Sequence, residues 1–174
     1  MTELKEIALQ KIGRNVVNFQ KIEGMLKLLI SQNNFKAPIS KIAATLEERK
    51  KAVKKKSFGK LTNEYFQLFS STKNHIHEVP NDRNEAWLSL SFQMENEDGT
   101  LPQQKAAFSF LVSERNRLIH QMLISFNPDS TDSCNLLIQE LDEQNKMIQR
   151  EYKNIQTLLI AIQEAKKELF TDTE

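Results

Sequence analysis

The chain of 174 residues has one cysteine, four glycines and four prolines, and no apolar run long enough to span a membrane. One cysteine cannot form an intramolecular disulfide, and Cys134 has no neighbouring histidine or cysteine to suggest a reactive or metal-binding role. The first 15 residues lack the apolar stretch of a signal peptide, so we expect a cytoplasmic protein. Few glycines and prolines, together with abundant Leu, Gln, Glu and Lys, favour helices.

Several catalytic motifs are also absent. The sequence contains no Gly-rich phosphate loop, no GxSxG elbow, no HExxH pair and no CxxC, which removes support for nucleotide hydrolysis, ordinary serine hydrolysis and zinc catalysis. His75 and His77 would share one face of a strand, but no further cysteine or histidine completes a metal site. We therefore expect neither a metal nor a cofactor.

Hydrophobic periodicity predicts an all-α fold with a small β-hairpin insert, in a single domain over residues 1–174. Alternating apolar and polar residues over 86–94 predict a half-buried strand, and 75–79 is its expected partner in a hairpin insert at about 74–94. A second helix is expected to begin at Ser40, a candidate cap. The other predicted helices span 4–31, 58–70, about 103–126 (the motif helix) and about 132–168.

A basic block is concealed by the net charge of +1. Between residues 36 and 60, nine lysines and arginines stand against two glutamates. Such a block can bind a phosphate backbone, although a Lys-rich helix is often only a solvated surface, and both interpretations stay open. The lysines that we predict to contact RNA are Lys50, Lys51, Lys54, Lys55 and Lys56.

The most informative stretch runs from Arg115 to His120, inside an otherwise apolar helical pattern. Arg115 and Asn116 have apolar neighbours one turn away, where a charged guanidinium is costly unless it is paired or bound to a ligand. Arginine binds phosphates, histidine transfers protons near neutral pH, and asparagine can orient either. The three residues are therefore candidate catalytic groups for phosphodiester chemistry, with an ordinary packed arginine and surface histidine as the simpler alternative.

Ideal helix geometry sets a condition on this site. Positions five apart point about 140° away from each other, so Arg115 and His120 can converge only through the long arginine side chain, a local distortion or a second subunit. Glu23 interrupts the apolar stripe of the first helix and is a candidate supporting residue that would pair with Arg115. An ordinary surface glutamate is the alternative.

The sequence ERNRLIH at 114–120 resembles the Arg-x(4–6)-His signature of HEPN domains, an all-helical family that includes many metal-independent ribonucleases. Segments 11–29 and 57–61 are similar to the N-terminal part of uncharacterised bacterial proteins that carry this motif. Some of those proteins append an OST-HTH/LOTUS RNA-binding module. The resemblance extends from Leu4 to Phe170 and implies a HEPN-like helical bundle.

By this resemblance the chain is expected to form a homodimer whose two motif helices line one cleft. His120 would act as general acid and base, Arg115 would stabilise the pentavalent phosphate, and Asn116 would orient the phosphate or His120. The products would carry 2′,3′-cyclic phosphates, and no metal would be needed. Met122 stands where toxins of HEPN/MNT pairs often have a tyrosine, so control by nucleotidylation is not expected.

The resemblance thus implies an RNA endonuclease in defence or toxin–antitoxin-like biology, with a second copy, RNA and a protein or antitoxin as candidate partners. HEPN-like domains also occur as non-catalytic modules for dimerisation, RNA binding or protein interaction, which is the alternative function. A nucleotide-binding regulator is a third alternative and has no dedicated motif.

Overall fold

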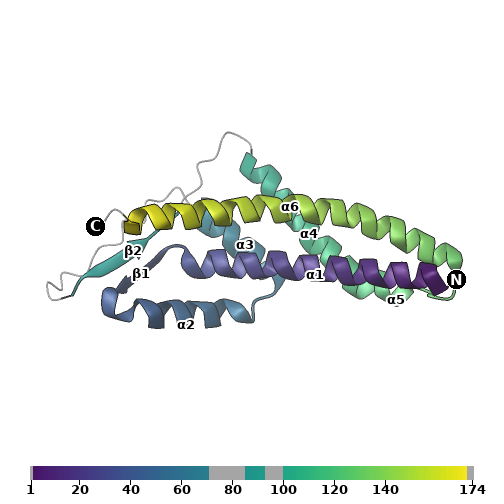
Figure 1. Ribbon diagram of the computed structural model, residues 1–174, viewed down its shortest axis with the longest axis horizontal. Helices are drawn as coiled ribbons and strands as arrows, with labels where there is room; N and C mark the ends of the chain where they lie inside the picture. The colour runs from purple at the N-terminus through teal and green to yellow at the C-terminus, as the bar shows by residue number, and fades with distance from the viewer. Residues whose placement is uncertain (1, 71–84, 93–99, 172–174) are drawn as a thin grey trace.

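The computed structural model describes residues 2–70, 85–92 and 100–171, which form a helical bundle with a small two-stranded sheet, as predicted (Figure 1). Two long helices, α1 (Thr2–Gln32) and α6 (Thr131–Thr171), run parallel side by side. Helix α4 (Thr100–Arg117) crosses this pair and leads through a π turn, η2 (Leu118–Met122), into the short α5 (Leu123–Ser125). No described helix is both long and apolar enough to cross a membrane.

The pairing of α1 with α6 follows from the spacing of their buried residues. Those of α6 recur every three or four positions, as in the seam of a coiled coil: Cys134, Leu137, Leu141, Gln144, Ile148, Glu151 and Ile155. Two of these seven positions are polar and need hydrogen-bond partners: Gln144 bonds to other helices, and Glu151 accepts from Arg150 and Asn154 of α6 itself. On α1 the buried stripe includes Phe19, Ile22, Leu26 and Leu29.

Helices α2 (Ile42–Lys54) and α3 (Phe58–Ser70) cover the half of α1 that is remote from its N-terminus (Figure 1). Between α3 and α4, the rings of Tyr65 and Phe66 lie 5.9 Å and 5.5 Å from that of Phe108, measured between centroids. These aromatic contacts anchor the first half of α4 to the bundle, because buried rings contribute large apolar areas.

The sheet differs from the predicted hairpin. Strand β2 (Trp87–Leu90) forms within the predicted segment, but it pairs antiparallel with β1 (Phe35–Pro38), which lies directly after α1. The proposed partner 75–79 lies outside the described residues. Strand β1 was not predicted, because four residues that end in proline carry too little alternation to be recognised as a strand.

The second helix also begins later than predicted. A 3₁₀ turn, η1 (Ile39–Lys41), precedes α2, and the hydroxyl of Ser40 bonds to the carboxylate of Glu85 instead of capping the helix. Ser40 therefore ties this turn to the segment before β2. The motif helix begins at Thr100 and is interrupted at Leu118, whereas α6 exceeds its predicted span at both ends.

Asn33 fixes the end of β2 to the end of α1. Its buried side chain donates to the backbone oxygen of Phe92 at 3.1 Å and accepts from the backbone N–H of the same residue at 2.7 Å. The following residue, Asn34, has a φ of 50°, a left-handed conformation that asparagine tolerates better than most residues. The chain can thus leave α1 and turn directly into β1.

The burial of Tyr65 in the aromatic cluster predicts that the protein loses stability at alkaline pH. Burial, with a contribution from the charge of Glu151, raises the pKa of Tyr65 to about 12. An unfolded tyrosine ionises near about 10, so the stabilisation is complete below that pH and is lost as the pH rises from there towards the folded pKa. Because the chain has only two tyrosines, Tyr152→Phe leaves Tyr65 as the single phenol.

Absorbance titration of Tyr152→Phe should therefore show phenolate formation near pH 12 or together with unfolding. The circular dichroism of the same samples reports unfolding. Ionisation close to the ordinary tyrosine value in a chain that is still helical would contradict the burial of Tyr65.

Candidate functional site

The predicted motif lies where α4 gives way to the π turn. The backbone N–H of Leu123 donates to the oxygen of Leu118, five residues earlier, and His120 lies in the middle of this turn. A π turn advances each residue by less than the roughly 100° of an α-helix. The angle between the directions of Arg115 and His120 is therefore smaller than in an ideal α-helix. Such a local distortion is one of the three ways in which the two side chains could converge. Single π turns inside helices occur frequently at functional sites.

The three predicted catalytic residues differ in burial. Asn116 and His120 are exposed, and Arg115 is half-buried. The guanidinium of Arg115 donates to the side-chain oxygen of Asn116 at 3.2 Å. The expectation that Asn116 lies in the apolar face of the helix is wrong, because the buried side of this segment is formed by other residues, Leu111 and Leu118 among them.

The buried polar residue of the motif is Glu114, which sequence analysis did not select as a site residue. Its side chain is 10% exposed and accepts hydrogen bonds from Nε and Nη2 of Arg117, at 3.0 Å and 3.1 Å. Arg117 also donates to Glu140 on α6 at 3.3 Å. The bond to Glu114 is the main cause that raises the pKa of Arg117. The motif thus contains one arginine committed to internal carboxylates and one, Arg115, without an acidic partner among the described residues.

A chain of hydrogen bonds extends from Glu114 across the bundle. Nε2 of Gln144 donates to the backbone oxygen and to Oε2 of Glu114, both at 3.1 Å. The side-chain oxygen of Gln144 accepts from Asn15 at 3.1 Å, and Asn15 donates also to the backbone oxygen of Leu141 at 2.8 Å. We call Asn15, Gln144 and Glu114 the polar relay. It links α1, α6 and the last turn of α4, directly before Arg115.

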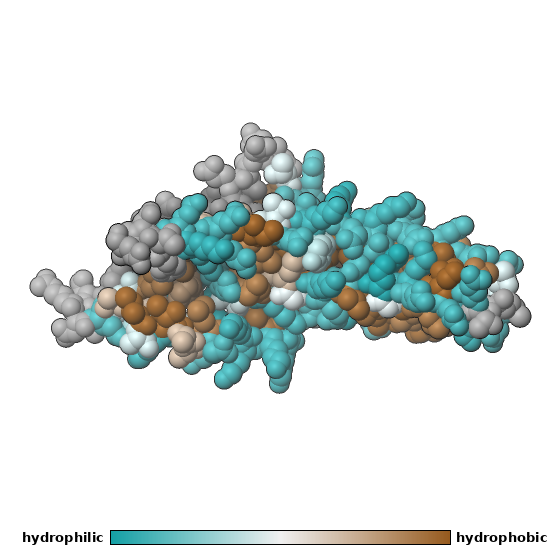
Figure 2. Space-filling view, viewed as in Figure 1, coloured by the Kyte–Doolittle hydropathy of each residue, from teal (hydrophilic) through white to brown (hydrophobic). Residues whose placement is uncertain are grey.

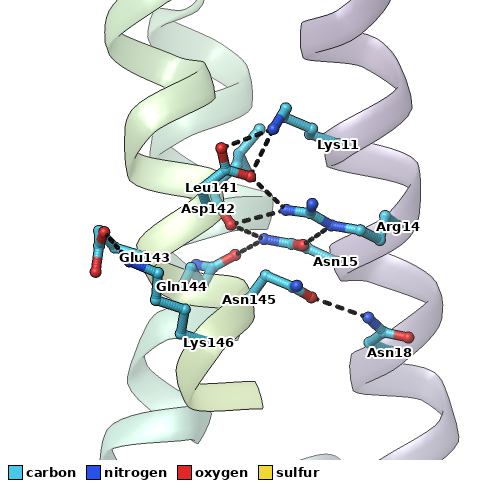
Figure 3. Close-up of polar contacts among 10 residues, drawn as sticks. All are labelled: Lys11, Arg14, Asn15, Asn18, Leu141, Asp142, Glu143, Gln144, Asn145 and Lys146. Carbon is cyan, nitrogen blue, oxygen red and sulfur yellow. Dashed lines mark hydrogen bonds and ion pairs between the residues drawn. The ribbon is translucent and has the colours of Figure 1, made fainter. Parts of the chain in front are cut away.

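Charged residues secure the α1 end of this relay (Figure 3). Arg14 donates to the side-chain oxygen of Asn15 at 3.0 Å and to Asp142 at 3.1 Å, and Lys11 contacts Asp142 at 2.6 Å. The hydrogen bond from Lys11 is the main cause that lowers the pKa of Asp142. Arg14 and Asn15 therefore have a structural role: both bind α6, and Asn15 is linked to the motif helix α4 through Gln144.

The predicted pairing of Glu23 with Arg115 is wrong. Glu23 accepts a hydrogen bond at 2.6 Å from Lys27, one turn further along α1. A partner four residues away on the same helix is within reach without any tertiary contact. Glu23 is thus part of a local ion pair.

The basic block lies away from the motif within one chain. Helix α2 packs against the half of α1 that is remote from its N-terminus. In contrast, η2 and α5 lie near the N-terminal end of α1 (Figure 1). Two of the five predicted RNA-binding lysines are engaged in ion pairs, Lys50 with Glu47 and Lys56 with Glu64. The other three are exposed on α2 and just after it, with no acidic partner among the described residues: Lys51, Lys54 and Lys55.

Arg49, also in the basic block, is structural. Its guanidinium donates to the backbone oxygens of Ile30, Ser31 and Asn33, at 3.2, 3.0 and 2.7 Å. Ile30 and Ser31 lie in the last turn of α1 and Asn33 directly follows it, where helix geometry leaves carbonyl oxygens without partners. Burial lowers the pKa of Arg49, and the guanidinium stays charged.

No metal centre accompanies the motif in the part of the chain that the structure describes, since no group of three or more His, Cys, Asp or Glu side chains there could hold an ion. His75 and His77 lie outside the described residues. A pocket of about 370 Å³ opens between η2 and α6 and is lined by Arg117, Gln121 and Glu140 among others. His120 is not part of its lining. The motif residues Asn116 and His120 therefore occupy open surface.

No family model, curated protein or solved structure matches this chain. The resemblance to HEPN domains consequently depends on the motif at 114–120 and on segments 11–29 and 57–61.

The polar relay gives a stability prediction. Gln144→Ala removes one partner of Asn15 and leaves Glu114 with one hydrogen-bond donor fewer in a buried position. We therefore expect a loss of about 1–3 kcal/mol in the free energy of unfolding. Urea denaturation measures this loss. Gln156→Ala, an exposed glutamine on the same helix, is the matched control and should change stability by less than about 0.5 kcal/mol. Equal effects of the two substitutions would contradict the relay.

Proposed function

We propose that the chain is a metal-independent RNA endonuclease of the HEPN type, which acts as a homodimer in the cytoplasm. The observation that supports this best is the π turn at His120, because it reduces the angle that separates His120 from Arg115. Asn116 and His120 are exposed and Arg115 is half-buried, so an RNA phosphate can reach the site without any rearrangement of the core.

The chemistry that fits these residues is a transfer of the phosphodiester within RNA. An imidazole of His120 accepts the proton of the ribose 2′-hydroxyl, and the 2′ oxygen forms a bond to phosphorus while the bond to the 5′ oxygen breaks. An imidazolium donates its proton to the departing 5′ oxygen. The products are a 2′,3′-cyclic phosphate and a 5′-hydroxyl.

Each residue has a separate task in this proposal. Arg115 balances the negative charge that increases on the phosphate oxygens in the transition state, for which a planar guanidinium is well shaped. Asn116 contacts Arg115 directly and orients it. Two proton transfers need two imidazoles or one that acts twice, and a second copy of the motif would supply the second imidazole.

The wider role follows from the activity. An RNA endonuclease of this kind belongs to defence or toxin–antitoxin-like biology, where a second protein or antitoxin restrains cleavage. The open surface around His120 gives such a partner direct access to the site.

The central test is cleavage of a mixed RNA pool by the purified chain in the presence of EDTA. We expect cleavage by the wild type and a loss of about 100-fold or more in His120→Ala and in Arg115→Ala, the scale typical of general acid–base and electrostatic groups. Arg115→Lys should recover little, because it keeps the charge and loses the planar fork.

Gln121→Ala is the matched control, since Gln121 is the next residue of the π turn and lines the pocket on the α6 side. It should cleave like the wild type. Folding and oligomeric state of every variant are compared by circular dichroism and sedimentation. The nuclease proposal fails if the wild type does not cleave, or if cleavage persists in both the His120 and the Arg115 variants.

A second candidate is a non-catalytic RNA-binding or interaction module, which the separation of the basic block from the motif favours. In that case Lys51, Lys54 and Lys55 contact phosphates, and replacing all three by alanine should weaken RNA binding and reduce the dependence of log K on log salt by about 2 for single-stranded RNA. Fluorescence anisotropy at several salt concentrations measures both.

The control for this experiment is the pair of substitutions Lys105→Ala and Lys153→Ala, which removes exposed lysines of α4 and α6. An equal change per lysine in the control would show that net charge, and not the basic block, governs binding.

A further inference from the structure

A groove runs between α4 and α6, beside the motif. The pocket of about 370 Å³ at η2 adjoins a second pocket of about 310 Å³ further along α6, and the two share Arg117, Leu136 and Glu140. From Ser133 to Met147 the α6 wall is about 21 Å long at ~1.5 Å per residue. This wall presents residues about one helical turn apart, as on one face of a helix: Leu136, Glu140, Glu143 and Met147. We call the two joined pockets the α4–α6 groove.

Apolar side chains line much of the α4–α6 groove. Leu136 is 60% exposed and Phe110 is 48% exposed. Beside the groove, Ile124 of α5 directly precedes the lining residue Ser125 and is 79% exposed. Figure 2 shows hydrophobic surface, in brown, along the region where α1 and α5 lie. Each exposed side chain would bury apolar area under a partner.

The charge of the groove is negative. Among the described residues, its lining has one arginine, Arg117, and three glutamates: Glu114, Glu140 and Glu143. Arg117 is shared between Glu114 and Glu140, and Glu143 pairs with Lys146 in an exposed ion pair, which contributes little. The segment 131–145 has four acidic residues and no lysine or arginine. The groove therefore favours an occupant with lysines or arginines and repels the phosphates of RNA.

The described part of a second copy does not supply such an occupant. Its lysine-rich helix is α2, where Val53 is 5% exposed because that side of the helix packs against α1. A second copy thus offers lysines without a free apolar stripe beside them. An apolar groove of this length instead fits an amphipathic helix, whose apolar residues recur at the i, i+3, i+4 and i+7 positions.

We propose that the α4–α6 groove binds an amphipathic, basic helix of a partner protein. The helix lays its apolar stripe over Phe110 and Leu136, and its lysines or arginines lie beside Glu140 and Glu143. The groove accommodates about four turns of such a helix.

A helix in this groove lies beside the motif, because Gln121 lines the groove and directly follows His120. It would restrict the access of RNA to His120. This effect on cleavage rests on the proposed function, whereas binding in the groove does not. Peptide binding by a wild type that cleaves no RNA would remove the nuclease proposal alone, and cleavage without peptide binding would remove the groove proposal alone.

The test uses a fluorescein-labelled helical peptide of about 18 residues, long enough for the groove, with leucines on one stripe and lysines on both flanks. A second peptide has glutamate in place of every lysine. Fluorescence anisotropy with the full chain at physiological ionic strength should show that the lysine peptide binds at least about tenfold more tightly than the glutamate peptide.

Substitutions on the groove locate the binding. Leu136→Ser and Phe110→Ser should each weaken binding of the lysine peptide about tenfold or more, because each removes exposed apolar area. Circular dichroism should show both variants folded, since neither side chain belongs to the buried core. Ile160→Ser is the matched control, at a 48% exposed position of α6 outside the groove, and should leave binding unchanged.

Glu143→Lys tests the charge. It should weaken binding of the lysine peptide about three- to fivefold and strengthen binding of the glutamate peptide by a similar factor, the scale of an exposed ion pair. Glu164→Lys makes the same change at an exposed position of α6 outside the groove and should alter neither.

The proposal is overturned if the lysine peptide does not bind, if the two peptides bind equally, or if binding persists in both Leu136→Ser and Phe110→Ser. A wild-type dimer that Leu136→Ser dissociates in sedimentation velocity would show that a second copy occupies the groove. RNA binding that is lost in the same variant would show that RNA occupies it. Either result also overturns the proposal.

Discussion

The structure depends on the satisfaction of polar groups within the seam between α1 and α6. Asn15 and Gln144 are buried in this seam, where a coiled-coil pattern calls for apolar residues, and Glu114 of α4 is buried beside it. Each of the three residues finds a hydrogen-bond partner on another helix. An unpaired group at any of these positions would cost more than an ordinary hydrogen bond contributes, so the three helices are held in one register. The relay therefore ends where α4 meets the motif, and it fixes the position of Arg115 and His120 relative to the core.

The π turn is the second constraint, and it acts on the motif directly. Leu118 and Met122 are both buried, while the turn between them exposes His120. Glu114 and Arg117 form an internal ion pair before the turn, which leaves Arg115 as the arginine of the motif that is free of carboxylates in the described structure. Cleavage of RNA would thus use one arginine of the motif while the other secures the helix.

Much of the helical architecture could be predicted from the sequence, because apolar residues in α1, α3 and α6 recur with the helical period over many turns. The errors came from short or isolated signals. Strand β1 is four residues long and ends in proline, and Ser40 bonds to a residue 45 positions away instead of capping its own helix. Glu23 pairs within its own helix. For β1 and Ser40 the deciding partner lies far away in the sequence, whereas the partner of Glu23 lies only four residues along the same helix.

The sequence by itself determined the helical class, the approximate helix spans and the presence of Arg115, Asn116 and His120 on one short segment, because these follow from residue type and spacing. Only the tertiary structure decided that Glu114 is buried and bonded to Gln144, that a π turn falls at His120, and that the lysines of α2 lie apart from the motif. These features depend on which helices pack together. Residues 30 to 130 positions apart in the chain supply the contacts, and periodicity along one helix carries no information about them.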